Sequence, residues 1–179
     1  MAIGRLTEGY KNYELLLRMI SVLASRRVIS QLTIIGEGPR RSVLEATTRS
    51  LGIQDLVTFA GRVEDHDLAR LLANSHLGLF PSRDSLAEKG FEGFGLVVQE
   101  MAAAGLPVLV GRAAGAVDAA GAAWSVLLNP DDLREWVEAV EWLAHDEPGR
   151  RQMACSALAW ARCVDHHAIA RECLKALSE

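Results

Sequence analysis

The run Leu32-Thr33-Ile34-Ile35, which ends at Gly36, decides the fold class of this chain. It is apolar on both sides and rich in β-branched residues, which is typical of a strand covered by helices on two faces. Similar runs end at a glycine or a proline, or just before an Asn-Pro pair, over residues 56–60, 77–80, 107–110 and 125–128. A further strand is expected over residues 1–3, either as a stub or, as we prefer, as the remainder of a longer strand behind an added Met1-Ala2 start.

Helical stripes of apolar residues separate these runs. One stripe extends from Tyr13 to Ala24, a second covers residues 133–143 after Asp131-Asp132, and a weaker one follows Asp65, the expected N-cap. Alternating strands and helices predict right-handed crossovers and a parallel sheet. We therefore expect an α/β, Rossmann-like, doubly wound fold as one domain over residues 1–179, in which residues from about 148 onward form two C-terminal helices.

Composition excludes several classes of protein. Lys plus Arg is 19 and Asp plus Glu is 23, a net charge of −4, which argues against a nucleic-acid binder. The three cysteines, at 155, 163 and 173, show no metal-site spacing and are expected to be reduced core thiols. The Asp165-His166-His167 cluster lacks a third ligand, so no metal site is predicted. No apolar run approaches the roughly 20 residues that span a bilayer, and no targeting signal is evident, so we expect a cytoplasmic protein.

The loops that follow the predicted strands hold the candidate site residues, because ligands of doubly wound sheets bind at the carboxyl ends of the strands. The longest of these loops ends in Glu92-Gly93-Phe94-Gly95-Leu96, just before a helix. The two glycines allow close approach of a ligand to the backbone, and the N–H groups at the helix start favour an anion or a hydroxyl. Glu100, eight residues beyond Glu92, is placed to bind two ribose hydroxyls. The alternative is that both are solvated surface carboxylates.

This segment resembles the E-x7-E signature of retaining GT-B glycosyltransferases of the group 1 type. The residues that carry the resemblance are Glu92-Gly-Phe-Gly-Leu-Val-Val-Gln-Glu100 and the following Met-Ala-Ala-Ala-Gly-Leu-Pro-Val. Three further blocks match in order: Gly-Arg-Leu at 4–6 with Lys11, Gly-Glu-Gly-Pro at 36–39, and Phe-Ala-Gly-Arg-Val at 59–63. The resemblance covers only the C-terminal, donor-binding half of such an enzyme. Residues 111–118 are most similar to its mannosyltransferase-like subgroup.

The resemblance implies a role for each matching residue. Arg5 and Lys11 would hold the diphosphate of a nucleotide-sugar, and Glu92 would accept hydrogen bonds from the sugar, so these three are the expected catalytic residues. Lys11 stands one residue further from Arg5 than in the commonest form of the motif. Glu100 would bind the ribose. The donor-binding set also includes loop residues that act largely through the backbone: Gly4, Gly36, Gly38, Pro39, Arg62, Val63, Gly93, Phe94, Gly95 and Leu96. Arg62 is equally well explained as a solvated loop charge.

The same resemblance implies a hexosyl transfer with retention of configuration and without a metal ion or other cofactor. The acceptor site of such an enzyme lies on an N-terminal domain that these residues do not match, so this domain alone is expected to be nearly inert. We expect any peripheral membrane association through that other half, and self-association through apolar surface left uncovered by it. Three alternatives stay open: the donor domain of a longer enzyme, a free-standing nucleotide-sugar binding module that needs a partner subunit, and a scaffold without a ligand. UDP and GDP remain equally possible as the nucleotide.

Overall fold

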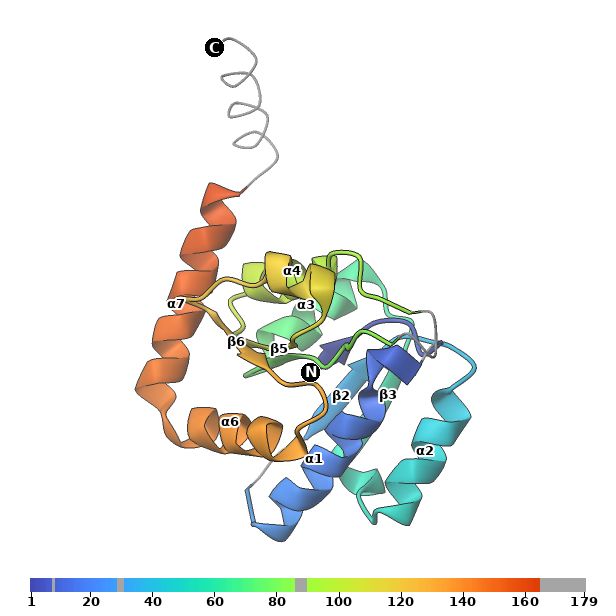
Figure 1. Cartoon of the computed structure of the whole chain (residues 1–179). Helices are drawn as coiled ribbons and strands as arrows, with labels where there is room; N and C mark the ends of the chain where they lie inside the picture. The colour runs from blue at the N-terminus through green and yellow to red at the C-terminus, as the bar shows by residue number, and fades with distance from the viewer. Residues whose placement is uncertain (8, 29–30, 86–89, 165–179) are drawn as a thin grey trace.

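The computed structural model describes residues 1–7, 9–28, 31–85 and 90–164. Strands and helices alternate along these residues, as predicted (Figure 1). Every predicted strand is present, with bounds that agree to within one residue. The strands are β1 Ala2–Ile3, β2 Leu32–Ile35, β3 Val57–Gly61, β4 Gly78–Phe80, β5 Val108–Gly111 and β6 Ser125–Leu128. The helices are η1 Gly9–Lys11, α1 Tyr13–Ser25, α2 Arg41–Ser50, η2 Gln54–Leu56, α3 Asp65–Ala73, α4 Leu96–Ala103, α5 Ala114–Ala119, α6 Leu133–His145 and α7 Glu147–Cys163.

All ladder pairings between the strands are parallel. They form two groups, β1-β2-β3 and β4-β5-β6. Hydrogen bonds of Met1 join the groups, because its amino group donates to Leu77 O at 2.9 Å and its carbonyl accepts from Leu79 N at 2.8 Å. The strand order is therefore β3-β2-β1-β4-β5-β6, which is the Rossmann order, and the α/β, doubly wound prediction is confirmed.

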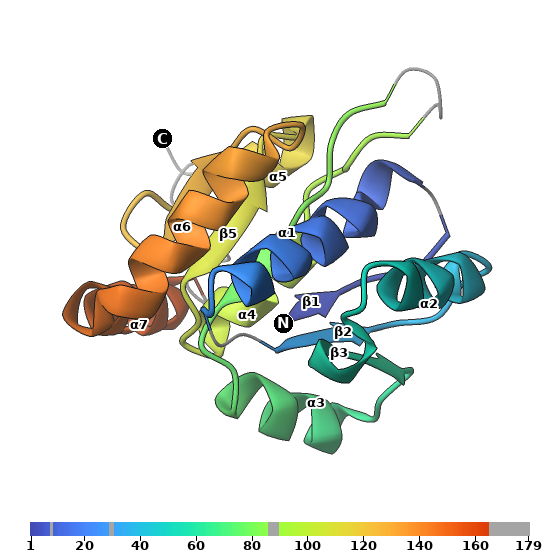
Figure 2. The same cartoon turned by 90° about the horizontal axis from the view of Figure 1, so that it is seen from below.

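Two hydrophobic cores cover the two faces of the sheet. Helices α1, α2 and α6 pack on one face, and α3, α4 and α5 pack on the other (Figure 1). Neighbouring residues of one strand point into different cores: Ile34 and Leu79 lie in the first core, and Ile35 and Phe80 in the second. Figure 2 shows α1 and α6 side by side on their face. This alternation explains why the strand sequences are apolar on both sides.

Two expectations about local structure need correction, and a third falls partly outside the described residues. The N-cap of α3 is Glu64, so Asp65 is the first helical residue and not the cap. Cys155 and Cys163 are free but exposed on the outer face of α7, so they are not core thiols; Cys173 lies outside the described residues. The segment after 147 begins with a single helix, α7, and the predicted second helix, with Asp165-His166-His167, also lies outside the described residues.

Candidate functional site

The carboxyl ends of β1 and β4 lie side by side at the centre of the sheet, where the strand order reverses. From β1 the chain continues into α1 on one face, and from β4 it continues into α4 on the other. The two connections diverge there, which in doubly wound sheets leaves a crevice for a ligand. Both loops that carry the predicted catalytic residues begin at this point.

An ion pair joins these two loops. Lys11 Nζ lies 2.6 Å from Glu92 Oε2, and the two side chains are only 14% and 12% exposed. The ammonium also lies 5.3 Å from the ring centroid of Tyr10 and 5.6 Å from that of Phe80, within the range of cation–π attraction. Aromatic rings thus surround a largely desolvated cation whose charged partner is a carboxylate 81 positions away.

Two further polar groups lie around the Glu92 carboxylate. Ser82 Oγ donates to Glu92 Oε2 at 3.2 Å. The buried Tyr13, the first residue of α1, is close enough to feel its charge: burial, and then the negative charge of Glu92, raise the pKa of the Tyr13 phenol above its usual range. The phenol therefore stays protonated at neutral pH, where its O–H remains a hydrogen-bond donor.

Glycines bring the loop after β1 against the loop after β2. A Cβ atom on Gly36 would lie 2.0 Å from the Gly4 carbonyl oxygen, and one on Gly38 would lie 2.3 Å from Leu6 O. Backbone hydrogen bonds hold the same contact, from Gly4 N to Ile35 O and from Leu6 N to Glu37 O, both 2.9 Å. Only glycine fits at 36 and 38, so these positions are explained by close packing of loops, whatever ligand they also receive.

The loop between β4 and α4 is anchored at several points. Arg83 N donates to Tyr10 O at 2.9 Å, and Gly115 N donates to Glu92 O at 3.1 Å. A Cβ atom on Gly115 would lie 2.0 Å from Gly93 O. Helix α4 begins only at Leu96, after the N-cap residue Gly95 in the left-handed region (φ 78°), which has no side chain to accept from the first N–H groups of the helix. Glu92 therefore lies in the loop, and only the second half of the Glu92–Glu100 spacing is helical.

The remaining predicted charges are exposed. Within the described ranges, the side chains of Arg5, Arg62 and Glu100 form no hydrogen bond or ion pair. Phe94 and Leu96 are 41% and 64% exposed, and Phe91 beside them is 71% exposed, so an apolar rim follows the loop. The structure thus brings Lys11 and Glu92 into contact and packs the predicted glycine loops together, while no hydrogen bond or ion pair among the described residues joins Arg5 or Glu100 to that pair.

Sequence reasoning missed Ser82 and the position of Tyr13. Ser82 was recognisable, because it is a polar residue two positions after β4 ends, at the edge where ligands bind. Tyr13 belongs to the apolar stripe of α1 and is indeed buried, and nothing in the stripe indicates that the charge of Glu92 acts on its phenol. Of the four tryptophans, Trp124 and Trp136 are buried, Trp160 is partly buried and Trp142 is half exposed.

Two cavities are distinct from the Lys11–Glu92 pair. The larger, about 460 Å³, lies at the amino ends of the strands, near Met1, Gln31 and His76, at the opposite edge of the sheet from the site. The smaller, about 260 Å³, is a polar recess at the carboxyl ends of β4, β5 and β6, lined by Arg83, Asp84, Arg112, Asn129, Pro130 and Asp131.

The described residues include neither a candidate metal centre nor a candidate membrane span. No group of three His, Cys, Asp or Glu side chains among them could hold a metal ion. In the same part of the chain, no helix is both long enough and apolar enough to cross a membrane.

Comparison with known proteins gives a consistent result. A family model described as "Glycosyl transferases group 1" matches residues 1–160. The D-inositol 3-phosphate glycosyltransferase of Corynebacterium diphtheriae is 30% identical over 163 residues, which cover 87% of this chain and 36% of that protein. A GDP-mannose-dependent monoacylated α-(1-6)-phosphatidylinositol monomannoside mannosyltransferase of Corynebacterium glutamicum is 28% identical, covering 79% of this chain and 36% of that protein.

Solved structures support the fold. The crystal structure of Anabaena HepE in complex with UDP superposes with a TM-score of 0.81 at 20% identity, covering 99% of this chain and 48% of that one. The same protein solved with UDP-glucose gives a TM-score of 0.79. The chain thus spans about a third to a half of the length of these proteins.

Proposed function

The chain belongs to the group 1 glycosyl transferases, and we propose that it is the nucleotide-sugar (donor) binding domain of a retaining hexosyltransferase. The donor is a UDP- or GDP-sugar, and the domain extends over residues 1–179. The acceptor binds to another part of the enzyme, and the domain alone is nearly inert because transfer needs both substrates held together.

The observation that carries this proposal is the Lys11–Glu92 ion pair at the point where the strand order reverses. A cation and a carboxylate are held there by two loops that diverge onto opposite faces of the sheet. Both are largely buried, which makes their electrostatic interactions stronger than in water. Each charge satisfies the other in the ion pair, and a ligand with an anionic part and several hydroxyl groups offers new partners to both.

The cations act on the diphosphate of the donor. As the bond between the sugar and the diphosphate breaks, its electron pair and the growing negative charge move to the leaving nucleoside diphosphate. The acceptor hydroxyl oxygen forms the new bond to the same sugar carbon, and its proton passes to the leaving group or to solvent. Lys11 leaves Glu92 and joins Arg5 in binding that charge. Fixed cations that bind developing charge lower the barrier for the chemical step. This arrangement requires no metal ion.

The carboxylates act on hydroxyl groups. Glu92, released from Lys11, accepts hydrogen bonds from the sugar, and the Gly93–Leu96 backbone and the exposed Phe94 line the space beside it. Glu100, on the second turn of α4, accepts from the ribose. The loops at 36–39 and 61–63, including Arg62, receive the base through backbone groups, which gives little discrimination between bases by side-chain chemistry.

The relatives support a nucleotide-sugar donor and leave its base open. One relative is named as dependent on GDP-mannose, whereas the HepE structures contain UDP or UDP-glucose. A free-standing binding module would take the same donor. Coding sequence that continues upstream of residue 3 would favour the donor domain of a longer enzyme over that module.

Isothermal titration calorimetry with UDP and GDP tests the donor site. We expect the wild-type chain to bind at least one of them, and Arg5→Ala and Glu100→Ala each to weaken binding by about tenfold or more, the effect of losing a charge-assisted hydrogen bond.

Two exposed residues of α6 supply matched controls. Arg134→Ala and Glu138→Ala remove charges that are 77% and 61% exposed and far along the chain from the site, and they should leave the affinity within about twofold. Full affinity in both Arg5→Ala and Glu100→Ala would refute the assignment of these residues. No heat with either nucleotide in the wild-type chain would refute the proposed function.

A further inference from the structure

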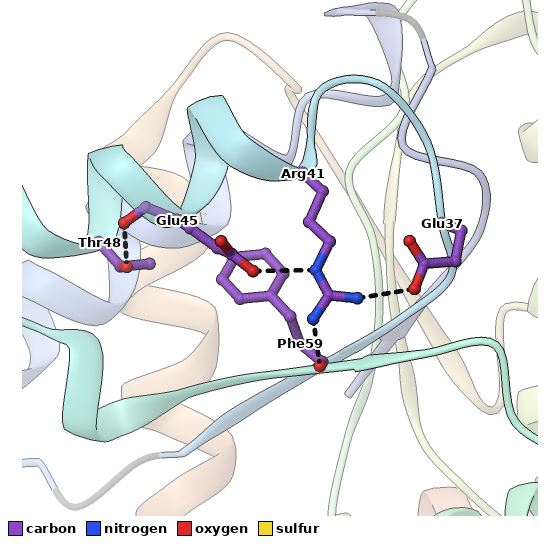
Figure 3. A network of polar contacts seen from close by, with 5 residues as sticks. All are labelled: Glu37, Arg41, Glu45, Thr48 and Phe59. Atoms are coloured by element: carbon purple, nitrogen blue, oxygen red, sulfur yellow. Dashed lines mark hydrogen bonds and ion pairs between the residues drawn. The ribbon is translucent and has the colours of Figure 1, made fainter.

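The guanidinium of Arg41, the first residue of α2, binds three separate segments (Figure 3). Its Nη1 lies 2.6 Å from Glu37 Oε1, in the loop after β2, and its Nε lies 2.9 Å from Glu45 Oε1, one turn along α2. Its Nη2 donates to the backbone carbonyl of Phe59, in β3, at 3.2 Å. An ordinary surface pair on a helix would make only the contact with Glu45, so the bonds to the loop and to β3 need another explanation.

The bond to Phe59 is made where β3 departs from regular pairing. Ile34 pairs with Phe59 but Ile35 pairs with Gly61, so Ala60 is an extra residue that forms a bulge. Bulges bend a strand and redirect the residues that follow it. Gly61 then adopts the left-handed region (φ 70°), and its carbonyl accepts a hydrogen bond from Gly36 N at 2.8 Å. Arg41 therefore holds the residue that precedes the bend and the loop that meets it.

Little free space remains between this network and the backbone at the bend. A Cβ atom on Gly61 would lie 2.6 Å from Glu37 Oε1 and 3.3 Å from Arg41 Nη1. The Glu37 carboxylate and the Arg41 guanidinium therefore occupy the space that a side chain at position 61 would take. The planar fork of arginine can donate in three directions at once, whereas a lysine ammonium on a flexible stem cannot reproduce that geometry.

We propose that Arg41 is a positioning residue that sets the relative placement of the two loops that receive the nucleobase, at 36–39 and 61–63. This inference rests on the proposed function, which assigns those loops to the base. Arg41 itself contacts no ligand in this proposal. It acts through Glu37 and the Phe59 carbonyl, and its loss changes the affinity for the base-bearing part of the donor and not for the diphosphate.

Calorimetry on three variants of the full chain tests the proposal, with the nucleoside diphosphate that the wild-type chain binds and with inorganic pyrophosphate, which lacks the base. We expect Arg41→Gln and Arg41→Lys to weaken nucleoside diphosphate binding by about fivefold or more, the effect of one misplaced set of hydrogen bonds. Both should leave pyrophosphate binding within about twofold. Arg151→Gln is the matched control: it breaks an i,i+4 pair with Glu147 on α7 and should change neither affinity.

Three results would overturn the inference while leaving the proposed function intact. The first is unchanged nucleotide affinity in folded Arg41→Gln. The second is an equal loss for the nucleotide and for pyrophosphate, which indicates general damage to the domain. The third is full recovery of binding in Arg41→Lys, which would show that charge matters and the fork does not. A wild-type chain that binds pyrophosphate but no nucleotide would overturn the assignment of the base loops, and with it both proposals.

Discussion

At the scale of single residues, the Lys11–Glu92 pair is the central feature of the molecule. Removing two charges from water is costly, and a buried pair recovers that cost only with good geometry and additional partners. Here Ser82 donates to the carboxylate and two aromatic rings face the ammonium. Such a pair contributes little net stability while intact, but either charge alone is left in a desolvated position. That is the behaviour expected of groups whose partners are exchanged when a ligand binds.

A double-mutant cycle on this pair is the first prediction at this scale. Lys11→Met leaves the Glu92 carboxylate without its cation and should lower the free energy of unfolding by about 2–4 kcal/mol. The double variant Lys11→Met/Glu92→Gln should recover at least about 1 kcal/mol of that loss. Urea unfolding of the wild-type chain, of Lys11→Met, of Glu92→Gln and of the double variant gives the coupling energy between the two residues.

The exposed pair Arg151–Glu147, at 78% and 56% exposure, is the control for the cycle. Its coupling energy should not exceed about 0.5 kcal/mol. A coupling energy for Lys11 and Glu92 as small as this would show that the two charges are solvated in solution and do not form a desolvated pair.

At the scale of elements, the apolar stripes locate the helices, whereas the first residue of each helix depends on its N-cap and on backbone geometry. The predicted start of α6 at Asp131-Asp132 is confirmed: Asp132 is the N-cap and accepts from Arg134 N at 2.9 Å and Glu135 N at 3.3 Å. The same reasoning failed at α3, because several acidic residues lie in a row there and Glu64, without a side-chain cap, takes the cap position. A stripe locates a helix, whereas its first residue depends on backbone geometry.

Removal of the α6 cap is a prediction at this scale. Asp132→Ala should lower the free energy of unfolding by about 1 kcal/mol, because two backbone N–H groups lose their acceptor. Asp131→Ala, one position earlier, removes a 68% exposed carboxylate that pairs with Arg83, and it should cost less than about 0.5 kcal/mol. Thermal or urea unfolding distinguishes them, and equal losses in the two variants would contradict the role of Asp132 as the cap.

In helix α7, the residues that are buried are decided by the contacts of the helix with its neighbours. It packs against both α4 and α6 at the edge of the molecule (Figure 1). Ala157 is fully buried, and the Trp160 ring lies 4.9 Å from that of Trp124, centroid to centroid. Its cysteines, by contrast, face solvent. Because cysteine occurs both in cores and on surfaces, only the orientation of the helix decides which, and the prediction of core thiols failed for that reason.

At the scale of the whole molecule, Met1 joins two half-sheets into one. The hydrogen bonds to Leu77 and Leu79 connect the strands of the β1–β3 group to those of the β4–β6 group. Each hydrophobic core then contains residues from both groups, such as Leu32 and Leu109 on one face and Ile35 and Val110 on the other. The two halves therefore share both cores and should not be stable separately.

This continuity predicts a single cooperative unfolding transition. Trp136 lies in the core under α1 and α6, whereas Trp124 and Trp160 lie in the other core. Trp136→Phe therefore leaves core tryptophans only in the second core, and the double variant Trp124→Phe/Trp160→Phe leaves one only in the first. Within each variant, urea midpoints from fluorescence and from far-UV circular dichroism should coincide. Two separated transitions in either variant would show that the half-sheets unfold independently, contrary to the shared cores.

The sequence by itself determined the strands, the parallel doubly wound class and the loops that hold the candidate site, because hydrophobic period and glycine or proline stops are local signals. It also carried the motifs on which the family resemblance was drawn, and that family is confirmed. Only the tertiary structure decided that Lys11 meets Glu92, that the charge of Glu92 acts on the buried Tyr13, and that Arg41 holds β3 to the loop after β2. These contacts join residues from 18 to 81 positions apart. Their geometry depends on how the loops pack at the sheet edge. A local sequence pattern does not indicate which distant residues such packing brings together.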